Sequence, residues 1–155
     1  MAGRARFRPT AALARLYDRV DMILQSLAGL PAFLAYFCTA FVIMVGYLFV
    51  YMWITPYDEF ELIRKNVPGA AIALGLSLLG FALPVASVIA HTETLIDCVI
   101  WSVIALIVQI VVYFVVRIPI HNLPQRIAAG ELAPAIWLGI ASLAAGALNA
   151  ASISY

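Results

Sequence analysis

Charged residues are scarce in this 155-residue sequence. The 9 Lys and Arg and the 8 Asp and Glu together make up 11% of the chain, whereas hydrophobic residues make up 65%. Mean hydropathy is +1.04. This composition lies outside the range of soluble domains and indicates a membrane protein. The net charge of only +1 gives no reason to expect nucleic acid as a partner.

The few charges are also unevenly distributed along the chain. Four stretches contain none: those between Asp21 and Asp58, between Lys65 and Glu93, between Asp97 and Arg117, and after Glu131. A helix needs roughly 20 apolar residues to cross a bilayer core about 30 Å thick. We therefore predict an all-α membrane protein with four transmembrane helices, near residues 32–53, 69–90, 97–116 and 133–155.

Cysteine and histidine are nearly absent, with two of each. Cys38 and Cys98 fall near the starts of the first and third spans, so they lie at similar depth on one face, and whether they meet is open. Lone thiols in apolar helices usually act as small packing residues. His91 and His121 belong to loops on opposite faces, so they do not suit a shared haem. We expect no metal, no cofactor and no enzymatic activity.

The second half of the chain resembles the first. A shift of 64 positions aligns residues 54–91 with 118–155 without a gap and gives nine identities. Asn66 aligns with Gly130, and these two residue types best tolerate the left-handed conformation that ends a helix. We predict two tandem copies of helix, polar loop, helix, at residues 30–91 and 92–155, pointing the same way across the membrane.

Residues 1–29 form a basic arm before the first span. Its apolar residues recur at spacings of three and four, which predicts an amphipathic helix: Leu13, Leu16, Val20, Ile23 and Leu27. Such a helix would lie on the membrane surface or prolong the first span. We expect no cleaved signal peptide. Lys and Arg number five on the arm's face and four on the face of the two long loops, so orientation stays open.

The longest cluster of charge is the loop around Thr55–Asn66. Thr55, Pro56 and Asp58 read as a helix start, with a hydroxyl cap, a proline at the first helical position and an acid three residues after the cap. Asn66 would turn the chain back. The acids Asp58, Glu59 and Glu61 could be catalytic or ion-binding carboxylates. We favour a solvated, capped helix at the membrane interface, in which the helix dipole stabilises the acids.

The predicted spans contain a few polar side chains and many small ones. The intramembrane polar residues are Gln109, Asn149, Ser142 and Ser87. Amides in hydrocarbon usually form hydrogen bonds between helices, and the alternative is a polar path for a small solute or ion. Small residues let helix backbones approach closely, and we assign helix packing to Gly69, Ala73, Gly75, Gly80, Gly139, Gly146 and Ala150.

Several local patterns resemble one family. They are Thr55, Pro56 and Glu59 in the loop; Gly75, Gly80 and Pro84 in the second span; Gln109 in the third; and Asn149, Ala150 and Ala151 near the end. From about Leu30 onward the chain resembles the YjfL-type bacterial inner-membrane proteins, a family of unknown function. The resemblance implies a multi-pass protein of the bacterial inner membrane with four spans and a duplicated organisation. It implies no substrate and no catalytic residue.

Two functions remain open from the sequence. The first is a structural or envelope-accessory protein that packs in the lipid bilayer as a homo-oligomer or with other membrane proteins, as the small-residue ridges indicate. The second is a channel or transporter for a small solute or ion that uses Gln109 and Asn149.

Overall fold

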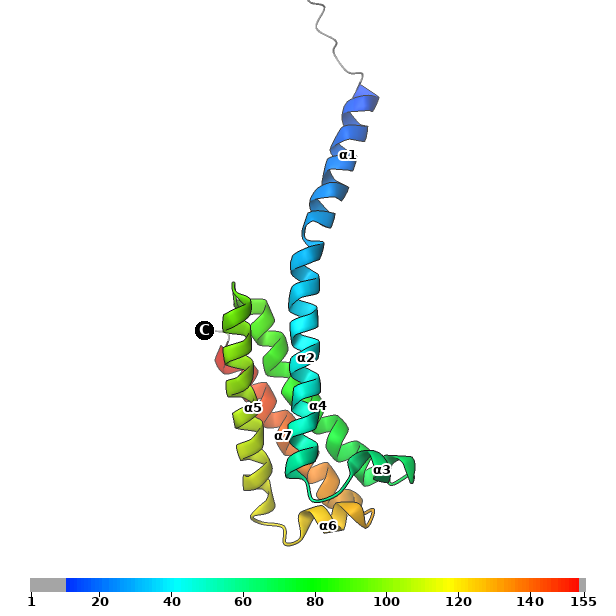
Figure 1. Cartoon of the computed structure of the whole chain (residues 1–155), viewed down its shortest axis with the longest axis vertical. Coiled ribbons are helices and arrows are strands. Elements are labelled where there is room, and N and C mark those ends of the chain that lie inside the picture. Colours follow the sequence, from blue (N-terminus) through cyan, green and yellow to red (C-terminus); the bar gives the residue numbers. More distant parts are fainter. Residues whose placement is uncertain (1–10, 154–155) are drawn as a thin grey trace, which may run out of the picture. The chain divides into compact units, whose positions relative to one another are not determined.

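The computed structural model describes residues 11–153, and over these the chain forms seven helices and no strand (Figure 1). The first ten residues of the basic arm, and the side chains of Leu13 and Leu16, lie outside the described residues. The helices are α1 (Ala11–Ala28), α2 (Leu30–Ile54), α3 (Glu59–Arg64), α4 (Pro68–His91), α5 (Leu95–Arg117), α6 (Leu123–Ala128) and α7 (Leu132–Ile153).

Four helices are long and apolar enough to cross a membrane. These candidate spans are Tyr17–Ile54, Pro68–His91, Leu95–Arg117 and Leu132–Ile153. They contain the four predicted spans, apart from the last two residues of the chain. The prediction of an all-α protein with four membrane-spanning helices is therefore confirmed, although the first candidate span also takes in most of α1.

The chain divides into two compact units, residues 1–35 and 36–155. In the first unit, α1 is separated from α2 by the single residue Gly29. The side chains of Val20, Ile23 and Leu27 are exposed. The amphipathic, surface-lying role of this helix stays a prediction.

The core of the second unit is the crossing of α4 and α7, which are the most extensively packed pair of helices (Figure 1). Their backbones are in contact where Gly80 meets Gly146, so a Cβ added at Gly146 would overlap the carbonyl oxygen of Gly80. A Cβ at Gly80 would likewise overlap the carbonyl oxygen of Ser142. Only residues without a side chain permit such an approach.

Most of the other small residues also face this seam. A Cβ at Gly69 would lie 3.2 Å from the carbonyl oxygen of Glu131, and one at Gly139 would lie 2.6 Å from Leu76 Cδ1. Ala73 is buried, and Ala150 is partly buried. The ridges therefore meet each other inside one chain.

Gly75 is the exception among the predicted packing residues. It is exposed, and a Cβ added to it would find nothing within 4 Å. Gly75 therefore has no packing partner within its own chain, and its packing against a second copy stays a prediction.

Helix α5 packs closely against both α4 and α7, whereas the backbone of α2 lies farther from these helices. Its contacts are made by side chains, with Tyr47 and Tyr51 buried and Ile43, Met44 and Leu48 partly buried against the core. The ring of Tyr47 stacks on Phe81 of α4 with centroids 4.4 Å apart. Tyr51 meets Tyr113 of α5 edge-on, with centroids 5.9 Å apart. About half of the remaining large side chains of α2 are exposed, among them Phe41, Phe49 and Trp53, as expected for one lipid-facing side of a helix.

Two matching turns connect the short helices to the long ones. After α3, Asn66 adopts a left-handed φ of 60°, and the Val67 N–H donates to the Leu62 carbonyl at 3.0 Å. After α6, Gly130 has φ 90°, and the Glu131 N–H donates to the Arg126 carbonyl at 3.0 Å. These bonds satisfy helix-end carbonyls in the Schellman pattern, and both left-handed residues are those predicted from the sequence.

Candidate functional site

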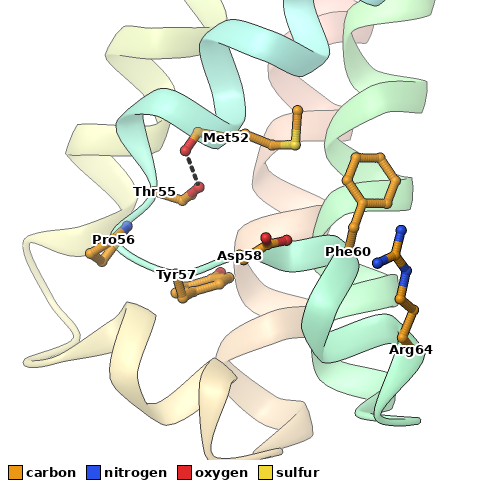
Figure 2. Close-up of a pocket in the computed structure, with 7 residues that line it drawn as sticks. All are labelled: Met52, Thr55, Pro56, Tyr57, Asp58, Phe60 and Arg64. Carbon is orange, nitrogen blue, oxygen red and sulfur yellow. Dashed lines mark hydrogen bonds between the residues drawn. The ribbon is translucent and has the colours of Figure 1, made fainter.

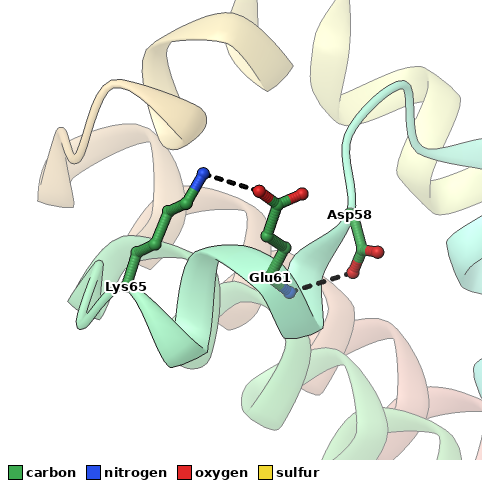
Figure 3. Close-up of polar contacts among 3 residues, drawn as sticks. All are labelled: Asp58, Glu61 and Lys65. Atoms are coloured by element: carbon green, nitrogen blue, oxygen red, sulfur yellow. Dashed lines mark hydrogen bonds and ion pairs between the residues drawn. The ribbon is translucent and has the colours of Figure 1, made fainter.

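The loop helix α3 begins at Glu59, and its cap is Asp58. The Asp58 carboxylate accepts a hydrogen bond from the Glu61 N–H at 3.0 Å, and the Lys65 ammonium pairs with Glu61 at 2.6 Å (Figure 3). The predicted cap at Thr55, with Pro56 as first helical residue, is wrong. The Thr55 hydroxyl instead donates to the Tyr51 carbonyl at 3.0 Å. The last carbonyls of a helix need hydrogen-bond donors, and the Thr55 hydroxyl supplies one for α2. Because Thr55 does not cap α3, this helix begins later, at Glu59.

Glu59 is the unexpected residue of this loop. Its side chain is only 1% exposed, and neither carboxylate oxygen has a hydrogen-bond partner. The expectation that all three acids are solvated is therefore wrong for Glu59. Burial raises the pKa of its carboxyl above the ordinary value. Polar contact with the Thr55 hydroxyl and with the backbone of Glu59 itself lowers this pKa in part, and the charge of Asp58 raises it further.

Two tyrosines and an amide continue this polar region into the membrane-spanning helices. Tyr51, Gln109 and Tyr113 are each at least nine-tenths buried, and the Tyr51 hydroxyl, Gln109 Oε1 and Tyr113 hydroxyl lack hydrogen-bond partners. All three line a cavity of about 10 Å³ between α2 and α5. The charge of Glu59 acts on both tyrosines. This cavity has about the volume that one water molecule needs.

The amide nitrogen of Gln109 takes part in hydrogen bonds that connect α4, α5 and α7. Gln109 Nε2 donates to the Ser142 carbonyl of α7 at 3.2 Å. The Ser77 hydroxyl of α4 donates to the Ser142 hydroxyl at 3.3 Å. Two of the predicted intramembrane polar residues are thus brought together, in the interhelical bonds that such residues usually form.

The other two predicted polar residues lie farther along α4 and α7. The Ser87 hydroxyl donates to the Ala150 carbonyl at 2.8 Å. Asn149 is partly buried, and its Nδ2 has no hydrogen-bond partner. The cavity that Gln109 lines does not include Asn149.

A larger, open hollow of about 590 Å³ lies where α2 ends and α3 begins (Figure 2). Met52 and Phe60 face it from the two helices, and the Asp58 carboxylate and the Arg64 guanidinium add charge of both signs. A second hollow of about 340 Å³ borders the start of α6 and includes Arg117 and His121. Solvent therefore reaches both loop helices.

The described residues contain no group of three metal-ligating side chains. Cys38 is exposed and Cys98 is buried, and both are free thiols. The His91 ring forms a 2.7 Å contact with the Ser87 carbonyl four residues earlier. The expectation of no metal, no cofactor and no enzymatic activity stays a prediction.

Sequence reasoning missed the central members of the buried cluster. Sequence reasoning placed none of Tyr47, Tyr51 and Tyr113 in a site. One signal was available: Tyr47 and Tyr51 are four residues apart in an apolar helix, so they share one face. Glu59 also differs from Glu61 in having no basic residue four positions later.

Comparisons with known proteins place the chain in a family. The family described as Domain of Unknown Function (DUF350) matches residues 25–153. Two similar relatives are the proteins named UPF0719 inner membrane protein YjfL from Escherichia coli K12 and O157:H7. Each is 34% identical over 129 residues, which cover 83% of this chain and 98% of the relative. No solved structure matches the chain.

The arm before residue 25 falls outside the family match, so the shared part begins near the first span. Inner-membrane relatives and four helices able to cross a bilayer confirm the predicted localisation. The chain belongs to the DUF350 family of multi-pass inner-membrane proteins, whose function is unknown.

Proposed function

We propose that this protein moves a small ion within the membrane, along the buried polar side chains of α2, α5 and α7. The single observation that carries the proposal is the clustering of unpartnered polar atoms. Among the described residues seven buried side-chain polar atoms have no hydrogen-bond partner, and five of them belong to Glu59, Tyr51, Gln109 and Tyr113.

Such a cluster is costly in a protein surrounded by lipid. Burying a polar group without a partner costs about 1–3 kcal/mol by mutational measures, and an unpaired charge costs more. Polar and ionisable groups inside membrane proteins are therefore usually retained for a function. The fold itself does not require the acid: Leu123, the first residue of α6, is 1% exposed, as is Glu59, the first residue of α3.

Gln109 links the cluster to the rest of the bundle. Its Nε2 donates a hydrogen bond to the Ser142 carbonyl, its Oε1 has no partner, and the residue lines the cavity between α2 and α5. Beyond Ser142, α7 presents Asn149 with an unpartnered Nδ2. The proposed route thus runs from the loop face through Glu59 and Gln109 toward Asn149.

Ion flux into vesicles tests this function. Purified protein would be reconstituted into phosphatidylethanolamine–phosphatidylglycerol vesicles with dyes for H⁺, Na⁺ and K⁺. We expect flux above that of protein-free vesicles, and we expect Gln109→Leu and Asn149→Leu to reduce it. The matched control is Ile110→Leu, a neighbouring apolar exchange. If both amide variants leave the flux unchanged, Gln109 and Asn149 do not take part in the function. If the parent protein passes none of the three ions, the proposed ion movement is contradicted.

The second candidate function is association with another membrane protein or with a second copy. One observation favours it: Gly75 interrupts the lipid-facing side of α4 and leaves open space there. In this proposal the protein is an envelope-accessory component and not an enzyme. Gly75→Leu would shift the oligomer to monomer on size-exclusion chromatography with light scattering, without loss of folding, because the side chain meets nothing in its own chain. An unchanged oligomer, or a monomeric parent protein, would exclude this face.

We also propose that the chain is a tandem duplication of a helix, loop helix, helix unit. Three correspondences at a spacing of 64 support it. Helices α3 and α6 each have six residues, at 59–64 and 123–128. The Schellman bonds from Val67 and Glu131 occupy matching positions, as do the long helices that start at Pro68 and Leu132. A structure in which α5 to α7 superpose poorly on α2 to α4 would contradict the duplication.

A further inference from the structure

The proposed function does not specify which ion moves, and the cavity between α2 and α5 limits which ions could bind there. Its volume of about 10 Å³ is about that of one water molecule. Three of the residues that line it, Tyr51, Gln109 and Tyr113, each carry a buried neutral oxygen without a hydrogen-bond partner. Divalent cations require about six or more oxygen ligands, which this cavity does not offer. A water with two to four polar partners is what such a site holds.

Glu59 supplies an acidic group next to this site. It acts electrostatically on Tyr51 and Tyr113, which line the cavity, and on Tyr57 in the turn before α3. Among the described residues, no cationic side chain forms an ion pair with its buried carboxylate. A carboxyl group in this setting is more stable with a proton than without one.

We propose that Glu59 and the cavity bounded by Tyr51, Gln109 and Tyr113 form a proton-binding site with one internal water. This inference rests on the proposed function and names its ion. A hydronium ion of the loop-face solvent gives its proton to one Glu59 oxygen, and water is left behind. The new O–H bond makes Glu59 neutral, and no oxidant or reductant is involved. The internal water and the two phenol hydroxyls both donate and accept hydrogen bonds, so they suit the onward transfer of that proton.

The charged and titratable groups around Glu59 are few and come from several elements. Asp58 precedes it and disfavours its charge. Tyr51 of α2, Tyr57 of the turn and Tyr113 of α5 lie within its electrostatic influence. Arg117 of α5 acts on Tyr57 and on Tyr113, whose ring lies 5.4 Å from the guanidinium carbon. Helix α4, which packs on α3, carries no titratable residue except His91 at its other end.

Infrared spectroscopy of the reconstituted protein across a pH series tests the site directly. We expect the carbonyl stretch of a protonated carboxyl to persist at pH values where solvated glutamates are ionised. Glu59→Gln should abolish this band, whereas Glu59→Asp, which keeps a carboxyl group, should still show a protonated-carboxyl band. Glu61→Gln, which removes a solvated acid of the same helix, should leave it in place. Circular dichroism and size-exclusion chromatography would show that each variant is folded.

The water is tested separately. Tyr51→Phe and Tyr113→Phe each remove one of the three oxygens and keep the ring, so we expect the loss of an internal-water O–H band and a shift in the pH at which Glu59 titrates. Tyr36→Phe, remote from the cavity in sequence, is the control. If Glu59 ionises at the pH of a solvated glutamate, or if neither tyrosine variant shifts its titration, the site does not exist as proposed.

The two proposals fail in different ways. Proton flux that survives in a folded Glu59→Gln variant would overturn the proton site and leave ion movement intact. If the infrared band of protonated Glu59 is present but the vesicles pass none of the three ions, the proton site is supported and ion movement is overturned. Flux of Na⁺ or K⁺ but not of H⁺ would overturn the proton as the ion.

Discussion

The two loop helices α3 and α6 have the same length and end in the same kind of turn, but they bury first residues of opposite polarity. Helix α3 begins after a side-chain cap from Asp58 and buries an acid, Glu59. Helix α6 begins after Asn122, which has a left-handed φ of 56° and forms no side-chain cap, and it buries Leu123. The same position of the fold thus accepts leucine in one half and glutamate in the other. The proposed proton site would explain why the position in α3 carries an acid that packing does not require.

Exchanging the two buried residues gives the largest expected effect. Leu123→Glu should lower the free energy of unfolding by about 2–4 kcal/mol, because it removes apolar burial and adds a polar group without a partner. Glu59→Leu should raise it by about 1–2 kcal/mol, because the unpartnered carboxyl is lost. Denaturation in detergent at neutral pH measures both. A destabilised Glu59→Leu protein would mean that the acid has a structural partner.

The glycines Gly75 and Gly139, 64 positions apart, form the second matched pair. Gly139→Leu should lower the free energy of unfolding by about 1–3 kcal/mol, because the new side chain would overlap Leu76. Gly75→Leu should not destabilise the monomer, because its surroundings are open and leucine favours helix. Thermal unfolding of both variants under monomeric conditions measures the difference, and equal losses would show that Gly75 of α4 and Gly139 of α7 are packed alike.

The caps of the loop helices give a smaller contrast. Asp58→Ala should cost about 1 kcal/mol, because it removes the acceptor of the Glu61 N–H bond. Asn122→Gly should change stability by less than about 0.5 kcal/mol, since glycine adopts a positive φ easily and gains freedom in the unfolded chain. Unfolding midpoints measured in parallel would test the contrast, and an equal cost at both positions would contradict it.

The carboxylates of the two halves should respond to pH in opposite directions. The raised pKa of Glu59 means that the native state keeps a proton that the unfolded chain has lost, so its contribution to stability falls as pH rises through that interval. The hydrogen bond from Arg126 lowers the pKa of Glu131, so its contribution is lost as pH falls. Unfolding temperatures of Glu59→Gln and Glu131→Gln, measured against pH beside the parent, separate the two, with a small effect expected for the exposed Glu131.

The spans and turns could be predicted because each depends on a local property. Uninterrupted apolar runs set the long helices, and the left-handed tolerance of Asn66 and Gly130 set the two turns. The site could not be predicted, because it depends on which way a side chain points. Glu59 and Glu61 are two residues apart with the same chemistry, yet one enters the bundle and the other faces solvent. Gly75 and Gly139 likewise differ only in what lies opposite.

The looser packing of α2 has a mechanical consequence. The contact between α4 and α7 runs backbone to backbone through Gly80 and Gly146, so displacing these helices would disrupt a whole seam. Displacing α2 would disturb contacts between side chains, such as the rings of Tyr47 and Tyr51 and the partly buried Met44. We therefore expect α2 to shift at lower energetic cost than α4 or α7, and the water-sized cavity lies between α2 and α5.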